Sequence, residues 1–177
     1  MTPSFFGYGS LVNRATHDYP AARPAQLRGW RRTWVRTDLR DVVFLSVRPD
    51  PGTFIDGLVA HVPGGDWAAL DLRETGYDRV PADGQVSVET GPVAVYQVPE
   101  ARQRQGGSHA ILLSYLDVVV QGFLREFGPA GVEAFFATTD GWNTPVTDDR
   151  GAPRYPRAQP ISPDERALTD RLLAQVQ

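Results

Sequence analysis

The stretch Phe6-Gly7-Tyr8-Gly9-Ser10-Leu11 decides how the fold of this chain is interpreted. Residues 4–8 have the aromatic and apolar composition of a short strand, and the glycine pair ends that strand. A strand that turns sharply at Gly-Tyr-Gly-Ser exposes consecutive backbone N–H groups, and such a concavity binds a carboxylate or an oxyanion. A glycine pair after a strand is more often a tight turn without a ligand. Both interpretations therefore stay open on this string alone.

The same string lacks the glycines of two known motifs. The third glycine of the dinucleotide-binding fingerprint is replaced by Val12. The nucleophile elbow of α/β-hydrolases has glycines where this chain has Tyr8 and Val12. The string therefore indicates neither a dinucleotide site nor a hydrolase elbow.

The whole chain has 177 residues, which is the size of one domain with one full core. Its 17 glycines and 15 prolines separate short segments, and no repeat or low-complexity tract occurs. We expect a single domain over residues 1–177. Its core is expected at residues 4–127, and C-terminal helices and an extended tail at residues 128–177.

The composition excludes several classes of chemistry. Because cysteine is absent, the chain has no disulfides, cysteine-rich zinc sites, iron–sulfur clusters or thiol nucleophiles. All 18 basic residues are arginine, so a Walker-type phosphate loop and a lysine Schiff base are excluded as well. Oxygen-based chemistry remains available.

Charge and hydropathy bear on partners and location. The net charge of −3, with both signs mixed along the chain, gives no electrostatic reason to expect a nucleic acid. No apolar stretch reaches the ~20 residues of a membrane span, and the first residues do not begin a signal peptide. We expect a cytoplasmic protein without nucleic-acid or membrane partners. The sequence indicates no oligomeric state.

Turn signals and periodicity predict six or seven short strands followed mostly by helices. Strands are expected at residues 4–8, 27–37, 42–47, 54–62, 77–80, 86–88 and 93–98. Helices are expected at residues 66–75, 111–127, 132–137 and 162–176. This order is typical of an α+β domain with a curled, barrel-like sheet.

Four local signals set boundaries. Pro49-Asp50-Pro51-Gly52 is a turn signal that predicts a hairpin between the third and fourth strands. Ser108 is expected to cap the longest helix, which Gly128-Pro129 ends. Ser162-Pro163-Asp164-Glu165 is a capping box that opens the last helix. Residues 144–160 are expected to run extended over the surface.

The first expected helix carries a carboxylate toward the core. At 100° per residue, Glu74 shares one side of the helix with Trp67 and Leu70, which must face the interior. Desolvation and the negative end of the helix dipole both raise the pKa of such a carboxyl toward neutrality, where a general acid/base works best. The alternative is a glutamate that pairs with Arg73 or Arg79 or turns out to solvent.

The remaining polar candidates carry weaker signals. His17, His61 and His109 are widely separated and lack metal-ligand spacing, so we expect no metal site. His61 lies inside an apolar strand, where a hydrogen-bonded core imidazole is the usual explanation. Ser10 as a nucleophile beside one of these histidines is a further alternative.

Together these segments resemble the γ-glutamylcyclotransferase superfamily, which includes the ChaC-like glutathione-degrading branch. The resemblance rests on Phe6-Gly7-Tyr8-Gly9-Ser10-Leu11 and on the helix Leu70-Asp71-Leu72-Arg73-Glu74 that runs into Gly76-Tyr77. Between them lie, in the order that such proteins show, Gly29-Trp30-Arg31-Arg32, Pro49-Asp50-Pro51-Gly52 and Gly57-Leu58-Val59. The resemblance covers residues 4–127.

The resemblance implies a mixed, partly closed β-barrel with flanking helices and a reaction that needs no cofactor. In that reaction the α-amine of a small-molecule γ-glutamyl substrate attacks its own γ-carbonyl, which releases 5-oxoproline and an amino acid, peptide or amine. It also implies roles for seven residues. These are Glu74 as the catalytic glutamate, Tyr8, Gly9, Ser10 and Leu11 as the loop that holds the γ-glutamyl group, and Tyr77 and Tyr115 as pocket residues.

Physical chemistry supplies a reason for the two main roles. The α-amine is an ammonium near neutral pH and must lose a proton before it attacks, and a partly buried Glu74 can accept that proton. Backbone amides at residues 9–11 could bind either the substrate's α-carboxylate or the oxyanion, and this choice stays open. A catalytically silent module that binds a γ-glutamyl or amino-acid ligand is the alternative function.

Two segments fall outside this pattern. Only Thr75 separates Glu74 from Gly76-Tyr77, where the glutathione-degrading branch has two residues, so the resemblance implies no specificity for glutathione. The tail with Arg154-Tyr155-Pro156-Arg157 is expected to pack against the barrel. The alternative is that its arginines recognise a substrate rich in carboxylates.

Overall fold

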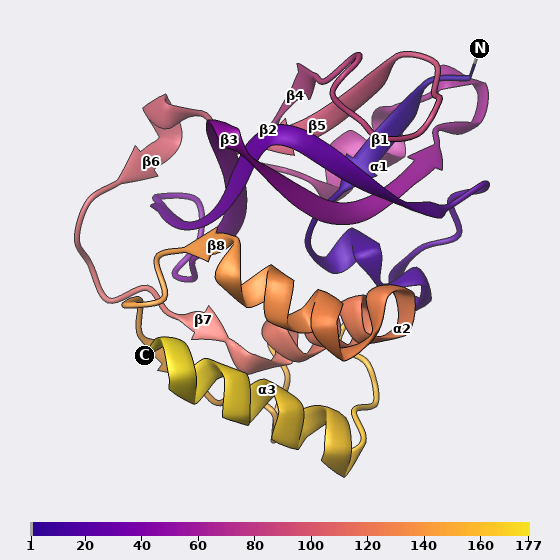
Figure 1. The fold of residues 1–177 in the computed structure, drawn as a ribbon. Coiled ribbons are helices and arrows are strands. Elements are labelled where there is room, and N and C mark those ends of the chain that lie inside the picture. The colour runs from indigo at the N-terminus through magenta and orange to yellow at the C-terminus, as the bar shows by residue number, and fades with distance from the viewer. Residues whose placement is uncertain (1) are drawn as a thin grey trace.

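One curled, mixed sheet forms the frame of the molecule. The computed structural model describes residues 2–177, and within them the sheet has seven strands in the order β4-β5-β1-β3-β2-β6, with β8 paired to β2. The strands are β1 (Ser4–Gly7), β2 (Arg23–Thr37), β3 (Phe44–His61), β4 (Asp78–Pro81), β5 (Val93–Gln97), β6 (Gln103–Arg104) and β8 (Thr139–Asp140). Because β1 is antiparallel to β3 and parallel to β5, the sheet is mixed. The expected α+β class with a curled, barrel-like sheet is confirmed (Figure 1).

Helices flank this sheet. They are α1 (Ala68–Arg73), α2 (Leu113–Ala137) and α3 (Pro163–Val176), with short 3-10 turns η1 (Ser10–Val12), η2 (Arg14–Thr16), η3 (Pro63–Gly65) and η4 (Glu100–Arg102). In Figure 1, α2 runs along the sheet and α3 lies on the side of α2 away from it. A separate short pair joins β7 (Ile111–Leu112) to β9 (Val146–Thr147). No helix within residues 2–177 is long and apolar enough to cross a membrane.

The expected hairpin at Pro49-Asp50-Pro51-Gly52 is wrong, because residues 44–61 form one long strand, β3. This strand pairs antiparallel with β2 along most of its length. The register passes from Arg28 opposite Phe54 to Trp30 opposite Pro49, so the turn residues form a bulge within β3. A bulge of this kind bends a strand pair and increases its twist, which helps to curl the sheet.

The other expected elements are largely found. The predicted strands at residues 77–80 and 93–98 correspond to β4 and β5, and the first and last helices to α1 and α3. The capping box is confirmed, because Ser162 Oγ accepts from the Glu165 amide and Glu165 Oε2 accepts from the Ser162 amide. The strand expected at residues 86–88 is wrong, since only Val86 forms an isolated bridge with Leu27.

The start of α2 differs from the prediction. Ser108 does not cap this helix, because Ile111 and Leu112 pair with β9 and the helix begins at Leu113. Instead, the Asp149 carboxylate accepts hydrogen bonds from the amide (2.8 Å) and the hydroxyl (2.5 Å) of Ser114. Gly128 breaks the helical backbone with φ 69° and ψ −173°, and the helix expected at residues 132–137 is the continuation of α2 beyond this kink.

The core is divided by the strand that leads to the site. Leu58 of β3 and Phe123 of α2 are fully buried in the main cluster, together with Phe6 of β1. Phe5, the neighbour of Phe6, belongs to a second cluster with Leu70 of α1, because successive strand residues point to opposite faces. The turn that follows β1 therefore emerges between α1 and α2.

Candidate active site

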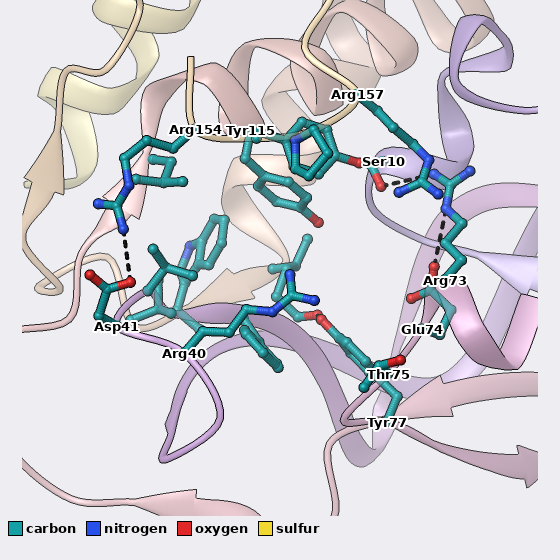
Figure 2. A pocket seen from close by; sticks show the side chains of 18 of the residues that line it. Ser10, Arg40, Asp41, Arg73, Glu74, Thr75, Tyr77, Tyr115, Arg154 and Arg157 are labelled. Atoms are coloured by element: carbon teal, nitrogen blue, oxygen red, sulfur yellow. Dashed lines mark hydrogen bonds and ion pairs between the residues drawn. The ribbon is translucent and has the colours of Figure 1, made fainter. Parts of the chain in front are cut away.

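A cavity of about 530 Å³ opens where α1, the start of α2, the β2–β3 connection and the tail meet (Figure 2). Its size is ordinary for a site that binds a small molecule. The lining side chains come from segments that are far apart along the chain. They are Ser10, Trp34, residues 40–45, Ala69, residues 72–75, Tyr77, Leu112, Tyr115 and residues 154–157.

The buried side chain of Arg32, on β2, holds the turn between β1 and η1 in place. Its Nε donates to the Tyr8 carbonyl oxygen (2.8 Å), its Nη1 to Thr138 Oγ1 (2.9 Å), and its Nη2 to the carbonyl oxygen of Asp56. Burial lowers the pKa of Arg32 to about 9, so its guanidinium keeps its charge at neutral pH. The Tyr8 hydroxyl donates to the Tyr96 carbonyl oxygen (2.7 Å). The backbone around residue 8 is therefore fixed by two buried side chains.

A small hollow of about 30 Å³ adjoins the cavity and reaches the turn itself. The Tyr115 hydroxyl lies against the turn there, next to Gly9. A Cβ on Gly9 would lie 2.7 Å from Tyr115 Oη, so only glycine lets this hydroxyl come so close to the backbone. Ser10 and Leu11 begin η1, and the first amides of a helical turn have no partner within that turn.

Glu74 lies at the C-terminal end of α1, where Gly76 turns the chain at φ 101°. Its side chain is 16 % exposed and lies on the cavity wall. Burial raises the pKa of the Glu74 carboxyl, while the charges of Arg73 and Arg157 act in the opposite direction. Arg73 Nε lies 3.3 Å from Glu74 Oε1. Glu74 is therefore a desolvated carboxyl. It is also the partner of Arg73, which was the alternative expected from the sequence.

Arg73 connects this carboxylate to the loop. It donates through Nη2 to Ser10 Oγ (3.3 Å) and through Nη1 to the Thr16 carbonyl oxygen (2.8 Å). Figure 2 shows Arg73 between Ser10 and Glu74. The guanidinium therefore holds the end of α1 and the η1 turn at one side of the cavity.

Two tyrosines complete this wall. The Tyr77 hydroxyl donates to the Leu45 carbonyl oxygen (2.8 Å), and its ring stacks on Phe44 at 5.6 Å between centroids. Burial raises the pKa of both Tyr77 and Tyr115 well above the ordinary value, so both hydroxyls stay protonated at neutral pH. Tyr115 therefore keeps a proton that it can donate, and its hydroxyl lies close to Gly9 of the loop.

The structure brings all seven residues singled out in the sequence to one region, in two groups. Ser10, Glu74, Tyr77 and Tyr115 line the main cavity and also the adjoining hollow. Tyr8, Gly9 and Leu11 line the hollow alone. The side chain of Tyr8 is buried in the main core cluster and that of Leu11 in the second cluster, which leaves the backbone of these residues to face a ligand.

The structure adds side chains that the motifs did not single out for the site. Arg40 and Asp41, from the β2–β3 connection, lie on the cavity wall, and nothing in the sequence separates them from ordinary turn residues. Arg154, Tyr155 and Arg157 of the tail lie there too, with the rings of Tyr155 and Tyr115 5.0 Å apart in an edge-to-face contact. The run Arg-Tyr-Pro-Arg was the one signal in the sequence that pointed to these tail residues. A role for its arginines in substrate recognition was the alternative to simple packing against the barrel.

The histidines lie elsewhere. His17 contacts the Leu11 carbonyl oxygen through Nε2 (2.9 Å) and accepts from the Tyr19 amide through Nδ1, so it is engaged in supporting the loop. None of the described residues that line the cavity is a histidine, which leaves Ser10 without the base that a serine nucleophile needs. Within residues 2–177, no group of three or more His, Cys, Asp or Glu side chains is placed to hold a metal ion.

Comparisons with known proteins give similarity at the level of structure. No protein-family model matches the chain, and no curated protein matches it either. A solved structure described as a gamma-glutamyl cyclotransferase is similar with a TM-score of 0.56 and 14 % identity, over 95 % of this chain and 98 % of that one. An uncharacterized protein from Homo sapiens is similar with a TM-score of 0.57 and 14 % identity, over 94 % and 97 % of the two chains.

YkqA from Bacillus subtilis has a TM-score of 0.55 and 17 % identity over 75 % of this chain. The match covers 52 % of YkqA, so this chain spans about half the length of that protein. The two full-length similarities agree with the curled mixed sheet of this chain. By its architecture, this chain has the γ-glutamylcyclotransferase-like fold.

Proposed function

We propose that this protein is a γ-glutamylcyclotransferase, which converts a γ-glutamyl compound to 5-oxoproline and a free amino acid, peptide or amine. One observation carries the proposal: the buried carboxyl of Glu74, with its raised pKa, shares a cavity wall and the adjoining hollow with the η1 turn. A proton acceptor and a row of backbone donors are the two groups that this cyclisation needs. The similarity to a gamma-glutamyl cyclotransferase structure supports the same reaction.

The reaction begins with the substrate's α-ammonium. Glu74, in its carboxylate form, accepts one proton from it, and the resulting amine attacks the γ-carbonyl carbon of the same molecule. Glu74 passes this proton to the leaving nitrogen, and the bond between that nitrogen and the γ-carbonyl carbon breaks. The ring nitrogen then still carries one proton more than the lactam needs, and the Glu74 carboxylate transfers it to the released amine, which leaves as an ammonium ion. The ring closes without water, and Glu74 ends in the form in which it began.

The cavity supplies position as well as proton transfer. Cyclisation requires the γ-glutamyl chain to fold so that its amine faces its own carbonyl, and holding this conformer contributes several kcal/mol to the rate. The Leu11 amide at the start of η1 and the protonated hydroxyl of Tyr115 are donors on the same side as Glu74. They can stabilise the oxygen that becomes negative as the amine attacks.

Release of 5-oxoproline tests this proposal directly. The purified protein is incubated with glutathione and with a panel of γ-glutamyl amino acids and amines, and 5-oxoproline is measured. Glu74→Gln removes the proton acceptor and keeps the shape of the side chain, so we expect turnover to fall about 100- to 10,000-fold. The matched control is Glu133→Gln, because Glu133 is exposed on α2 and does not line the cavity. Equal turnover in both variants would remove Glu74 from the reaction.

The ion pair between Arg73 and Glu74 supports a second candidate, a binding module without catalysis. In that case Glu74 would only hold Arg73 against the loop. A γ-glutamyl ligand would then raise the melting temperature of the protein without any release of 5-oxoproline. Glu74→Gln would change the affinity for the ligand and nothing else.

A further inference from the structure

The side chains that line the cavity carry more positive than negative charge. The four guanidinium groups on its wall face two carboxylates, and each carboxylate already has a partner. Glu74 pairs with Arg73 at 3.3 Å, and Asp41 accepts from Arg154 Nη2 at 2.8 Å. Among the described residues, no side-chain ion pair is formed by the two remaining arginines, Arg40 and Arg157.

Arg157 lies at the end of the cavity that holds the reacting groups. Figure 2 places it beside Ser10 and Arg73, on the same side as Glu74. Arg157 is half-buried. Its positive charge acts on the Glu74 carboxyl and opposes part of the rise in the Glu74 pKa that burial causes. A cation at this place lies within reach of an anion held between the η1 turn and Glu74.

Arg40 lies on the other side. It belongs to the β2–β3 connection, and in Figure 2 its guanidinium extends across the cavity toward Tyr77. The guanidinium carbon is 5.9 Å from the centre of the Phe44 ring. Arg40 is exposed, and the same cavity is also lined by apolar side chains, among them Val42, Val43 and Leu72. A guanidinium without an ion-pair partner, at the mouth of a cavity with apolar lining, can bind the carboxylate of a ligand whose remaining parts are apolar.

A γ-glutamyl amino acid or peptide carries two carboxylates, one on the γ-glutamyl group and one on the leaving group. Building on the proposed function, we propose that Arg157 binds the α-carboxylate of the γ-glutamyl group and that Arg40 binds the carboxylate of the leaving group. The preferred substrates are therefore γ-glutamyl amino acids or peptides with apolar side chains rather than γ-glutamyl amines. Arg40 is the residue that sets this preference.

Two ligands that differ only in the second carboxylate test the assignment, namely γ-glutamylphenylalanine and γ-glutamylphenethylamine. Their dissociation constants are measured by calorimetry with the wild type, Arg40→Gln and Arg157→Gln, and 5-oxoproline release is followed in parallel. A charge-assisted hydrogen bond is lost with the second carboxylate, so the wild type should bind the acid about tenfold more tightly than the amine. In Arg40→Gln the two ligands should bind with equal affinity. Arg40→Lys should regain part of the preference for the acid.

Arg157→Gln should weaken both ligands by a similar factor, because both keep the γ-glutamyl carboxylate. Arg28→Gln is the matched control, since Arg28 is exposed on β2 and outside the cavity, and it should change neither affinity. Equal affinity of the wild type for acid and amine, or an unchanged ratio in Arg40→Gln, would overturn the assignment. If the ratio behaves as expected but no 5-oxoproline forms, the carboxylate sites stand and the proposed reaction fails.

Discussion

In the proposed reaction, Glu74 is the residue that transfers protons. Its position in the last turn of α1, in phase with buried Leu70, carries its carboxyl into the wall of the cavity. Burial raises its pKa, so the charged form that accepts a proton is held in an environment that disfavours it. The carboxylate is thereby a stronger base than an exposed glutamate, and Arg73 keeps it in place.

The raised pKa has a consequence for stability. The folded protein holds the Glu74 proton more tightly than the unfolded chain, so its advantage over Glu74→Gln is complete below the ordinary pKa of 4.5. That advantage is lost as the pH rises through the raised pKa. Urea unfolding is measured for the wild type and Glu74→Gln at a series of pH values. The free energy of unfolding of the wild type, relative to that of Glu74→Gln, should decrease as the pH rises. The opposite slope would mean that pairing with Arg73 outweighs burial.

Gly9 is the second residue on which the site depends. In Gly9→Ala the new Cβ would lie 2.7 Å from Tyr115 Oη and 3.1 Å from Leu45 Cδ2, so the tyrosine must move away from the loop. We expect 5-oxoproline release to fall about 100-fold, the cost of a misplacement near 1 Å, and the fold to persist. Gly52→Ala is the control, because the bulge in β3 has room for a methyl group. Full activity in Gly9→Ala would show that the contact between Tyr115 and the loop is dispensable.

Residue-scale features could be predicted where local physics decides them. The helical phase of Trp67, Leu70 and Glu74 sufficed to place a carboxyl beside the core. Its ion pair with Arg73 was foreseen only as an alternative, because neighbouring residues on a helix end meet or separate according to the surroundings. Arg40 could not be predicted, since its direction depends on a connection between two strands whose pairing was itself misjudged.

At the scale of elements, β2 supports the turn between β1 and η1. Its buried Arg32 satisfies the carbonyl oxygens of Tyr8 and Asp56. Arg32→Met would leave these buried acceptors without donors, at about 1–3 kcal/mol each. We expect the free energy of unfolding to drop by at least about 2 kcal/mol in urea titrations, and 5-oxoproline release to fall in the protein that remains folded. A variant as stable as the wild type would show that water replaces the guanidinium.

The misjudged hairpin has a physical explanation at this scale. Pro49-Asp50-Pro51-Gly52 has the composition of a turn, and local composition alone cannot distinguish a turn that reverses the chain from a bulge that bends it. Pairing with β2 decided the outcome, because β2 runs far enough to match both halves of β3 across Gly29. Elements with complete local signals, such as the capping box of α3, were predicted correctly.

At the scale of the molecule, the C-terminal segment closes one side of the site. The Asp149 carboxylate accepts from the Ser114 amide and hydroxyl and from the Arg154 amide (2.9 Å), which ties the tail to the start of α2. Tyr155 and Arg157 follow this anchor directly and line the cavity. Residues more than 30 positions apart therefore cap the helix and shape the site together, and no local pattern in the sequence could reveal this.

Asp149→Asn tests the anchor. Burial acts to raise the Asp149 pKa, but the hydrogen bonds from Ser114 and the Arg154 amide outweigh it, so the net pKa lies below the ordinary value of 3.8. The carboxylate therefore stabilises the fold above that ordinary value, and this stabilisation is lost as the pH falls through the lowered pKa. At neutral pH the variant should be less stable by about 1 kcal/mol, the usual value of a helix cap, with a gap that narrows in acid. A gap that stays constant with pH would contradict a role for the charge.

The central claim is that Glu74 and the η1 turn hold one γ-glutamyl group between them. A crystal structure of Glu74→Gln soaked with γ-glutamylphenylalanine tests it most directly, since the bound molecule should survive in this variant. The account predicts the γ-glutamyl amine within hydrogen-bonding distance of the residue 74 side chain. It predicts the γ-carbonyl oxygen on the Leu11 amide and the Tyr115 hydroxyl, and the α-carboxylate on Arg157. A ligand bound only near the β2–β3 connection, away from both groups, would contradict the account.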